Sequence, residues 1–415
     1  MKILHLTIFD RKGGACIAGY RQHQALVAAG IDSSMWVRQK FTDDPKVFEY
    51  RPHSDLPTRL RRVSRRFHLQ STRKSSAPIG EMFDDRSEHG GNELRQLPPH
   101  DLINLQFSQG FVDLSSLYER IDASTPIVVT LHEMSMFTGG CSYAYACRNF
   151  EQSCGQCPLL GKSGPDDASA RSWQRKQQGY ARRSPENLQF VADSHWLADE
   201  ARKSGLIGRF PIQVIHYGID TGVFQPHANP AARALLNLPD DGPVIAFAAA
   251  SVSDERKGVS LLAEAIRTLP QKPFLLTWGG SFPKALADLP HLHLGPIDSE
   301  HLVSIAYNAA DFFVIPSQEE AFGQTCLESM SCGRPVIGFD VGGIPDMILH
   351  NETGLLVPKG NVPALAQAIQ RLIDDPQHAE TMGRKAREMV MAKFTFAHNA
   401  EAYRKLYGEM LDFQC

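Results

Sequence analysis

Two glutamates in the second half of the chain have a spacing that suits the binding of one ligand. Seven residues separate Glu320 from Glu328. If a helix begins near Thr325, Glu320 lies in the loop before it and Glu328 about one turn inside it, so both carboxylates could face the same ligand. Two ordinary solvated carboxylates are the alternative interpretation. Four backbone amides would lie at the start of that helix, where anions and above all phosphates are favoured: those of Phe322, Gly323, Gln324 and Thr325.

A strand, a loop, a helix and a second strand are needed to position these groups, and residues 311–346 predict that order. The unbroken apolar run Phe312–Ile315 is typical of a parallel strand covered on both faces. A helix follows the loop, and Gly333 can take the left-handed position at its end. Val336–Phe339 then predicts the next strand. The glutamates therefore follow the carboxyl end of a strand, where doubly wound sheets bind ligands.

A basic pair lies in a second loop of the same kind. The apolar run Val244–Ala250 predicts a strand, and Arg256 and Lys257 follow it just before a predicted helix. Side-chain charge and helix amides act together there, so the pair predicts an anion site. A solvated basic pair beside Asp254 and Glu255 is the alternative interpretation.

Two positions in the first half have comparable placement. Gly14 follows the predicted strand Ile3–Thr7 in a tight loop that opens a helix, and a plain turn is the alternative to a ligand loop. His132 ends the apolar run Ile127–Leu131, where a ligand role and a structural role are both open.

The stretch EEAFGQTCLESMSCGRPVIGFDVGGIPDMI resembles the donor-site signature of GT-B glycosyltransferases, specifically the retaining family 4 that uses nucleotide sugars. The resemblance implies an α/β fold of two Rossmann-like, doubly wound parallel-sheet domains facing a cleft. It also implies that Glu320 contacts hydroxyls of the transferred sugar and that Glu328 holds the ribose of the nucleotide.

The same resemblance assigns roles to residues outside that stretch. Lys257 matches the family's phosphate-binding lysine, Gly14 lies in the loop used near the diphosphate and acceptor, and His132 matches a histidine that faces the donor sugar. Two positions depart from the family. Ser251 replaces the usual arginine, which leaves open whether Arg256 substitutes for it, and Tyr217 replaces the usual asparagine before Gly-Ile-Asp.

The length of 415 residues predicts two domains of about 200 residues each. We expect an acceptor domain over residues 1–220 and a nucleotide-sugar donor domain over 221–394. The resemblance implies that a last helix, residues 395–415, crosses back to the first domain.

Four cysteines lie within seventeen residues of the first domain, two of them as C-x-x-C before a proline: Cys141, Cys147, Cys154 and Cys157. Four soft thiolates suffice for a closed tetrahedral zinc site, which would be structural because no position remains open. A redox pair of Cys154 with Cys157 and unliganded buried thiols are the alternatives. The segment resembles a cysteine-bearing insertion in family 4 enzymes of exopolysaccharide synthesis of the colanic acid type.

Residues 56–74 form a basic amphipathic segment. Leu56, Leu60, Val63 and Phe67 recur at helical spacing among six arginines. Such a helix can lie on an anionic membrane surface. A helix docked on its own domain with solvated arginines is the equal alternative.

The charge and the lengths of the apolar runs limit which classes of partner we expect for this protein. The net charge of -3 gives no reason to expect nucleic acid as a partner. The N-terminal apolar run is too short for a signal peptide, and no run is long enough to span a membrane, so we expect a cytoplasmic protein with peripheral contact to the inner face of the membrane as an option.

Taken together, the residues and the resemblance predict retaining transfer of a hexosyl unit from a UDP- or GDP-linked sugar to a glycan or polyprenyl-linked acceptor in exopolysaccharide or cell-surface polysaccharide synthesis. The resemblance also implies that catalysis requires no metal cofactor, because in GT-B enzymes positive side chains and helix dipoles stabilise the diphosphate. Alternatives are a nucleotide-sugar epimerase, a sugar-phosphate synthase, and an inactive scaffold of an assembly complex.

Overall fold

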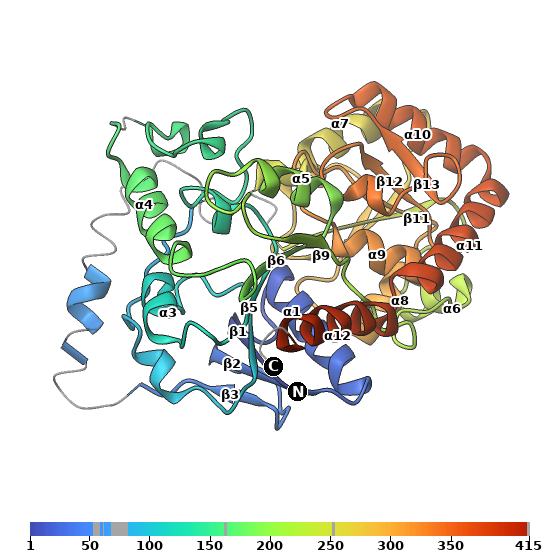
Figure 1. The fold of residues 1–415 in the computed structure, drawn as a ribbon. Coiled ribbons are helices and arrows are strands. Elements are labelled where there is room, and N and C mark those ends of the chain that lie inside the picture. Colours follow the sequence, from blue (N-terminus) through green and yellow to red (C-terminus); the bar gives the residue numbers. More distant parts are fainter. Residues whose placement is uncertain (53–58, 61, 68–81, 162–163, 251–253, 413–415) are drawn as a thin grey trace. The chain divides into compact units, whose positions relative to one another are not determined.

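The computed structural model describes residues 1–52, 59–60, 62–67, 82–161, 164–250 and 254–412. The chain divides into two compact units (Figure 1). Unit 1 comprises Met1–His216 and the segment that begins at Asn399, and unit 2 comprises Tyr217–His398. The division falls at residue 216, four residues before the predicted boundary.

Unit 1 is built on a seven-stranded sheet in the order β3-β2-β1-β4-β5-β6-β7, and all its neighbouring strands are parallel. Its strands are β1 (Lys2–Phe9), β2 (Asp32–Gln39), β3 (Val47–Glu49), β4 (Leu102–Leu105), β5 (Ile127–Leu131), β6 (Leu188–Ala192) and β7 (Ile212–Val214). Its helices include α1 (Gly14–Ala28), α3 (Leu114–Arg120), α4 (Ala168–Tyr180) and α5 (His195–Lys203). The strand order reverses direction between β1 and β4, which makes this pair the switch point of the sheet.

Unit 2 is built on a six-stranded parallel sheet in the order β10-β9-β8-β11-β12-β13. Its strands are β8 (Val244–Ala249), β9 (Phe274–Gly279), β10 (His291–His293), β11 (Phe312–Ile315), β12 (Val336–Phe339) and β13 (Gly354–Val357). Its helices include α6 (Asn229–Leu235), α7 (Val259–Thr268), α8 (Glu300–Ala309), α9 (Gln324–Ser331), α10 (Val362–Asp374) and α11 (Pro376–Lys393). The switch point lies between β8 and β11.

The last helix, α12 (Phe396–Asp412), begins in unit 2 and continues in unit 1, where it is drawn in dark red (Figure 1). Its tyrosines are fully buried in unit 1. Gln22 of α1 donates to the hydroxyl of Tyr407 at 3.0 Å, and Thr130 of β5 lies 3.1 Å from the hydroxyl of Tyr403. Tertiary hydrogen bonds therefore tie the end of the chain to the first sheet.

The predicted strands in front of the candidate site are confirmed. All four residues of β11 and all four of β12 are buried, as expected of apolar runs in a sheet covered on both faces. Helix α9 begins at Gln324, one residue before the predicted start, and Gly333 after it has a positive φ of 72°. Helix α11 was not predicted, because its polar sequence carries only a weak apolar periodicity.

Candidate functional site

Lys257 and Glu320 follow the two strands that flank the switch point of unit 2. Lys257 lies eight residues after the end of β8, and Glu320 lies five residues after the end of β11. Strands β8 and β11 are hydrogen-bonded neighbours and run parallel, so their carboxyl ends meet at one edge of the sheet. The topology thus brings together two residues that are 63 positions apart in the sequence.

The ammonium of Lys257 donates to Oε2 of Glu320 at 2.7 Å. The hydroxyl of Ser317 donates to the same oxygen at 3.2 Å, and Nη1 of Arg256 lies 4.0 Å from it. Burial of the carboxyl opposes its charged form, but the charges of Lys257 and Arg256 and the hydrogen bonds outweigh that cost, so the pKa of Glu320 is lowered. Glu320 is therefore an anion at neutral pH and forms an ion pair with Lys257.

Arg256 has hydrogen-bond partners in its own loop and in the loop after β11. Its Nη2 donates to Asp254 at 2.8 Å, and its Nη1 donates to the carbonyl oxygen of Glu319 at 2.9 Å. Its carbonyl oxygen accepts from the amide of Gln318 at 2.7 Å. Arg256 thus fastens the loop after β8 to the loop after β11. Ser251, where the resemblance expects an arginine, lies outside the described residues.

Two glycines let these loops approach each other closely. Gly258 has a φ of 67°, and a Cβ there would lie 1.8 Å from the carbonyl oxygen of Pro316. Gly342 has a φ of 55°, and a Cβ there would lie 1.7 Å from the carbonyl oxygen of Glu320. The same oxygen accepts from the amide of Gly343 at 3.0 Å. The backbone of Glu320 is therefore supported by a turn that sequence reasoning missed, although its signal, the Gly-Gly pair after β12, was present.

The start of α9 has the predicted position next to Glu320. Gly323 precedes the helix with a φ of 99°, and a Cβ there would be 3.3 Å from Ile315 and 3.5 Å from Cγ of Glu320. Gln324 and Thr325 form the first turn and are partly exposed. The ring of Phe322, in contrast, is buried and packs edge-on against Tyr217, with ring centroids 5.0 Å apart. Only the backbone of Phe322 could therefore contact a ligand at the start of α9.

Glu328 is buried on α9, and its Oε2 accepts from the hydroxyl of Tyr307 on α8 at 2.9 Å. The tyrosine is fully buried and packs against Trp278 and Phe313. Sequence reasoning missed Tyr307 because nothing in its local pattern links it to a glutamate 21 residues away.

The predicted residues of unit 1 lie at the ends of its central strands. Gly14 is exposed and begins α1, directly after Gly13, whose φ is 85°. His132 follows β5, and its Nε2 lies 2.8 Å from Oε1 of Gln106, which follows β4. An amide oxygen only accepts, so this ring nitrogen carries the proton. Burial lowers the pKa of His132 to about 3, so the ring is neutral.

Gln106 is the centre of a buried polar network that sequence reasoning missed. Its Nε2 donates to Gln22 at 2.8 Å and to Asn104 at 3.1 Å, and it lies 3.2 Å from Nδ1 of His5. Asn104 in turn donates to Tyr407 of α12. The orientation of His132 is thus fixed by residues from β1, α1, β4 and the last helix. Polar residues at alternate positions of an otherwise apolar strand were the available signal.

The comparison with known protein families gives a match within unit 2. Residues 242–375 match the sequence model of the family described as glycosyl transferases group 1. This range contains Lys257, Glu320 and Glu328 with the geometry given above. The match to this family therefore lies within unit 2.

Curated proteins similar to this chain include a D-inositol 3-phosphate glycosyltransferase of Mycolicibacterium smegmatis. It is 31% identical over 216 residues, which cover 49% of this chain and 48% of the relative. The chain therefore spans about half the length of the curated relatives it matches.

Solved structures establish the fold of the whole chain. A sucrose-phosphate synthase of Thermosynechococcus elongatus aligns with a TM-score of 0.71 and 22% identity over 100% of both chains. Anabaena HepE, solved with UDP and glucose and with UDP-glucose, aligns with a TM-score of 0.68 and 16% identity over 98% of this chain and 99% of its own. The two-unit α/β architecture is the GT-B fold of glycosyltransferases.

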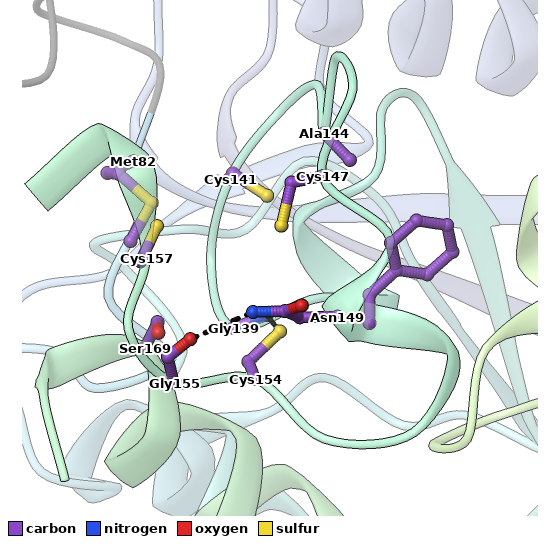
Figure 2. A pocket seen from close by; sticks show the side chains of 11 residues that line it. Met82, Gly139, Cys141, Ala144, Cys147, Asn149, Cys154, Gly155, Cys157 and Ser169 are labelled. Carbon is purple, nitrogen blue, oxygen red and sulfur yellow. Dashed lines mark hydrogen bonds between the residues drawn. The ribbon is translucent and has the colours of Figure 1, made fainter. Parts of the chain in front are cut away.

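In unit 1, one cavity is lined by Cys141, Cys147, Cys154 and Cys157 (Figure 2). All four lie outside any disulfide bond. They lie on the segment between β5 and α4, beyond His132.

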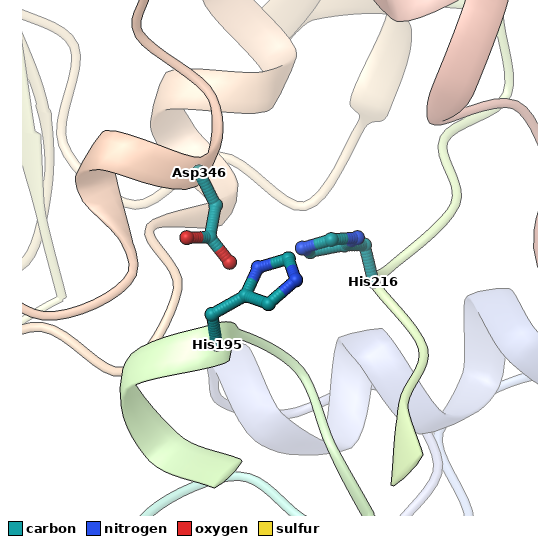
Figure 3. Close-up of side chains that lie close together, drawn as sticks. All are labelled: His195, His216 and Asp346. Carbon is teal, nitrogen blue, oxygen red and sulfur yellow. The ribbon is translucent and has the colours of Figure 1, made fainter. Parts of the chain in front are cut away.

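Two histidines of unit 1 also lie close together (Figure 3). His195 begins α5 and His216 follows β7, and their ring centroids are 5.4 Å apart at 54°. The third residue drawn there, Asp346, belongs to unit 2, where it ends the 3-10 turn Ile344–Asp346.

Over the described ranges, no helix is long and apolar enough to cross a membrane.

Proposed function

We propose that this protein is a retaining hexosyltransferase that moves a sugar from a nucleotide diphosphate to a hydroxyl of a glycan or polyprenyl-linked acceptor. The observation that carries the proposal is the Lys257–Glu320 pair at 2.7 Å, placed at the switch point of a glycosyl transferases group 1 domain. A sugar hydroxyl and a phosphate are the two groups that such a carboxylate and such an ammonium bind.

The proposed reaction balances without any covalent enzyme intermediate. The bond between C1 of the sugar and the diphosphate oxygen breaks, and a bond from C1 to the acceptor oxygen forms on the same face. The acceptor's proton passes to the departing diphosphate. Most of the catalysis is then stabilisation of the charge that develops on the diphosphate.

Lys257 and the first-turn amides of α9 supply that stabilisation in this proposal. Lys257 is already held in place by Glu320, so little reorganisation is needed when the charge develops. Glu320 orients the sugar through its remaining oxygen, and Glu328, fixed by Tyr307, holds the ribose. Positive side chains and helix amides take the place that a divalent metal would fill, so we expect turnover without added metal.

UDP-linked sugars are the first donors to test. HepE, which shares the fold, was solved with UDP and with UDP-glucose. GDP-linked sugars are the second set. The deciding measurement is nucleotide release from each donor with and without a polyprenyl-linked acceptor, and failure of every donor would overturn the proposal.

Phosphorylated small molecules form a second class of acceptor. The curated relative is named for D-inositol 3-phosphate, and a solved structure of the same fold is a sucrose-phosphate synthase. Nucleotide release that depends on inositol 3-phosphate or on a sugar phosphate, and not on a lipid-linked glycan, would favour this class.

The same assay separates the remaining alternatives when the donor sugar is labelled. An epimerase returns label in a free or nucleotide-linked epimer without an acceptor, whereas the transferase places label in the acceptor product. An inactive scaffold releases no nucleotide at all. Product stereochemistry by NMR then decides between retention and inversion.

The setting we propose is exopolysaccharide or cell-surface polysaccharide synthesis, at the inner face of the cytoplasmic membrane. The support comes from residues 59–60 and 62–67, which are helical and have an outward apolar face. Leu60, Val63 and Phe67 lie on one side of this helix and are 60%, 50% and 68% exposed. The rest of the predicted basic segment, residues 56–58, 61 and 68–74, lies outside the described residues.

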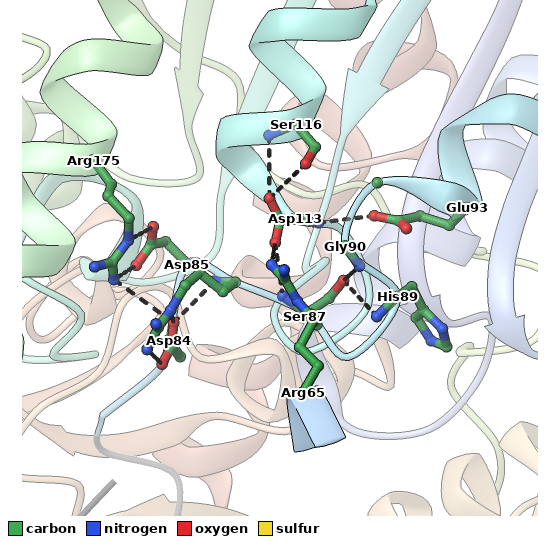
Figure 4. Close-up of polar contacts among 12 residues, drawn as sticks. Arg65, Asp84, Asp85, Ser87, His89, Gly90, Glu93, Asp113, Ser116 and Arg175 are labelled. Carbon is green, nitrogen blue, oxygen red and sulfur yellow. Dashed lines mark hydrogen bonds and ion pairs between the residues drawn. The ribbon is translucent and has the colours of Figure 1, made fainter. Parts of the chain in front are cut away.

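On the opposite side of this helix, Arg65 fastens it to the rest of unit 1 (Figure 4). Arg65 donates to Asp113 at 2.5 Å and to the carbonyl oxygen of Ser87 at 2.6 Å. Arg62 lies 3.7 Å from Glu88. The polar face therefore contacts the domain and the apolar face points away from it, which reverses the usual arrangement of a surface helix.

We propose that an anionic bilayer covers this apolar face. Arg59 and Arg66 are exposed beside it, and each basic residue near an anionic surface contributes about 1 kcal/mol to binding. The test is sedimentation with vesicles that contain anionic lipid and with neutral vesicles.

Replacement of Leu60, Val63 and Phe67 by Ser should abolish binding to the anionic vesicles. Leu235→Ser is the matched control, because Leu235 is also 68% exposed but lies in unit 2. Equal binding of the triple variant and the native protein would overturn the membrane proposal and leave the transferase proposal intact.

A further inference from the structure

We infer that Cys141, Cys147, Cys154 and Cys157 bind one Zn²⁺ ion, which locks the segment between His132 and α4. This inference does not depend on the proposed function. It rests on the convergence of the four side chains, the size of the space between them and the backbone that supports them.

The cysteines reach the same cavity from two separate loops (Figure 2). Cys141 and Cys147 come from the loop after β5, and Cys154 and Cys157 come from the loop before α4. The cavity has a volume of about 20 Å³, which is room for roughly one water-sized sphere. A tetrahedral zinc ion with Zn–S bonds of about 2.3 Å occupies a space of that order.

The loop that carries Cys154 and Cys157 has a constrained backbone. Gln156, between them, has a φ of 49°, which is uncommon for a residue with a side chain. A Cβ on the neighbouring Gly155 would lie 2.6 Å from the carbonyl oxygen of Pro165. Such conformations cost free energy and persist where the surroundings impose them. A metal bound on both sides of the turn is such a constraint.

Hydrogen bonds support one of the cysteine sulfurs and the backbone of the loops that carry the cysteines. The amide of Gly139 donates to Sγ of Cys154 at 3.1 Å, as expected around metal-bound thiolates, whose sulfurs accept from outer-shell donors. A Cβ on Gly139 would lie 2.8 Å from Cβ of Cys154, so only glycine permits this approach. Asp167 accepts from the amide of Cys157 at 2.8 Å, and Asn149 donates to the carbonyl oxygen of Gly155 at 3.0 Å.

Over its described residues this segment has no long helix or strand. Between β5 and α4 it forms the 3-10 turns Ser135–Phe137, Asn149–Glu151 and Pro158–Leu160 and one isolated β-bridge, between Cys141 and Met82. A zinc ion would join the two cysteine loops directly and add to the hydrogen bonds that hold them. Structural zinc sites contribute folding free energy in this way.

A zinc ion accounts for the position of all four cysteines on one cavity, whereas a disulfide accounts for only two of them. A Cys154–Cys157 disulfide would leave Cys141 and Cys147 on the same cavity without a role. No three of these four sulfur atoms lie within 4.8 Å of one another, so we expect the ion to draw the side chains inward by rotation about their χ1 angles.

Hydrogen bonds connect the segment that carries the cysteines to the loop after β5 and to helix α4. Met134, two residues after His132, donates its amide to the carbonyl oxygen of Ser142 at 3.0 Å. Lys176 of α4 donates to the carbonyl oxygens of Ser135 and Thr138 at 2.6 and 2.9 Å. Release of the ion should therefore loosen the loop that follows His132.

The test is metal analysis of the full chain, purified without chelator. We expect about one zinc per chain, and near-complete loss of zinc from Cys154→Ser and from Cys141→Ser. Cys332→Ser is the matched control, because Cys332 is a buried thiol of unit 2 that contacts a serine, Ser304, at 3.6 Å. This variant should keep its zinc.

Thiol alkylation of the native protein keeps the test independent of the variants' folding. The four cysteines should be protected until a chelator removes the metal, and Co²⁺ should then restore protection together with a thiolate-to-metal absorption band. Absence of zinc, cobalt and protection, or a Cys154–Cys157 disulfide found by mass spectrometry, would overturn the inference.

Discussion

Lys257 Nζ and Glu320 Oε2 are 2.7 Å apart and join the two loops at the switch point of unit 2. The side chains of both residues are mostly buried, with 24% and 12% of their surfaces exposed. A pair in this position either binds a ligand or stabilises the loops, and the variants below separate the two roles.

Lys257→Ala should lower turnover of the donor by about 10²- to 10³-fold, because one preorganised charge that stabilises the transition state is lost. Nucleotide release under saturating donor measures the effect. Lys385→Ala is the control, since Lys385 is an exposed lysine of the same unit. Near-normal turnover of Lys257→Ala would remove this residue from the mechanism.

Glu320→Gln should make the melting temperature less dependent on pH in the acid range. The folded-state pKa of Glu320 lies below the ordinary value of 4.5, so its contribution to stability is present above that value and is lost as the pH falls through the folded pKa. The melting temperature of the native protein should therefore fall more steeply below pH 4.5 than that of the variant.

Glu352→Gln, at an exposed position of unit 2, is the comparison for that profile. It should follow the native curve. If Glu320→Gln does so too, the pair contributes nothing to stability and its purpose is binding alone.

Tyr307→Phe should weaken donor binding more than it slows the chemical step. The hydroxyl fixes Glu328 at 2.9 Å, and loss of one buried hydrogen bond costs about 1 kcal/mol. We expect KM for the donor to rise several-fold with a smaller change in kcat. In a double-mutant cycle, Tyr307→Phe should add little to Glu328→Gln; fully additive effects would show that the two residues act independently.

Gly342→Ala should displace Glu320. The new Cβ would lie 1.7 Å from the carbonyl oxygen of Glu320, so the backbone must move in addition to bearing the strain of a positive φ. Gly242→Ala carries the strain alone, because its φ is 89° and a Cβ added there would meet no other atom within 4 Å. Thermal unfolding and turnover of the two variants should differ, with both losses larger for Gly342→Ala. Equal losses would mean that the turn does not support Glu320.

The local sequence was enough to predict the strand that precedes the site and the helix that follows it. Apolar runs such as Phe312–Ile315 are buried wherever they occur in a parallel sheet, and the glycines beside α9 mark its ends. The shared role of Lys257 and Glu320 followed from the resemblance, whereas the pairing of β8 with β11 that brings the two side chains together came from the structure.

The partners of the site residues came only from the tertiary structure. Tyr307 on Glu328, Gln106 on His132 and Gly342 behind Glu320 are contacts between elements far apart in the chain. Local periodicity records which face of an element is buried, but it does not record which side chain of another element meets it. The sequence by itself therefore determined the strands, the helix ends and the residue types of the site, while packing decided which groups are paired, neutral or charged.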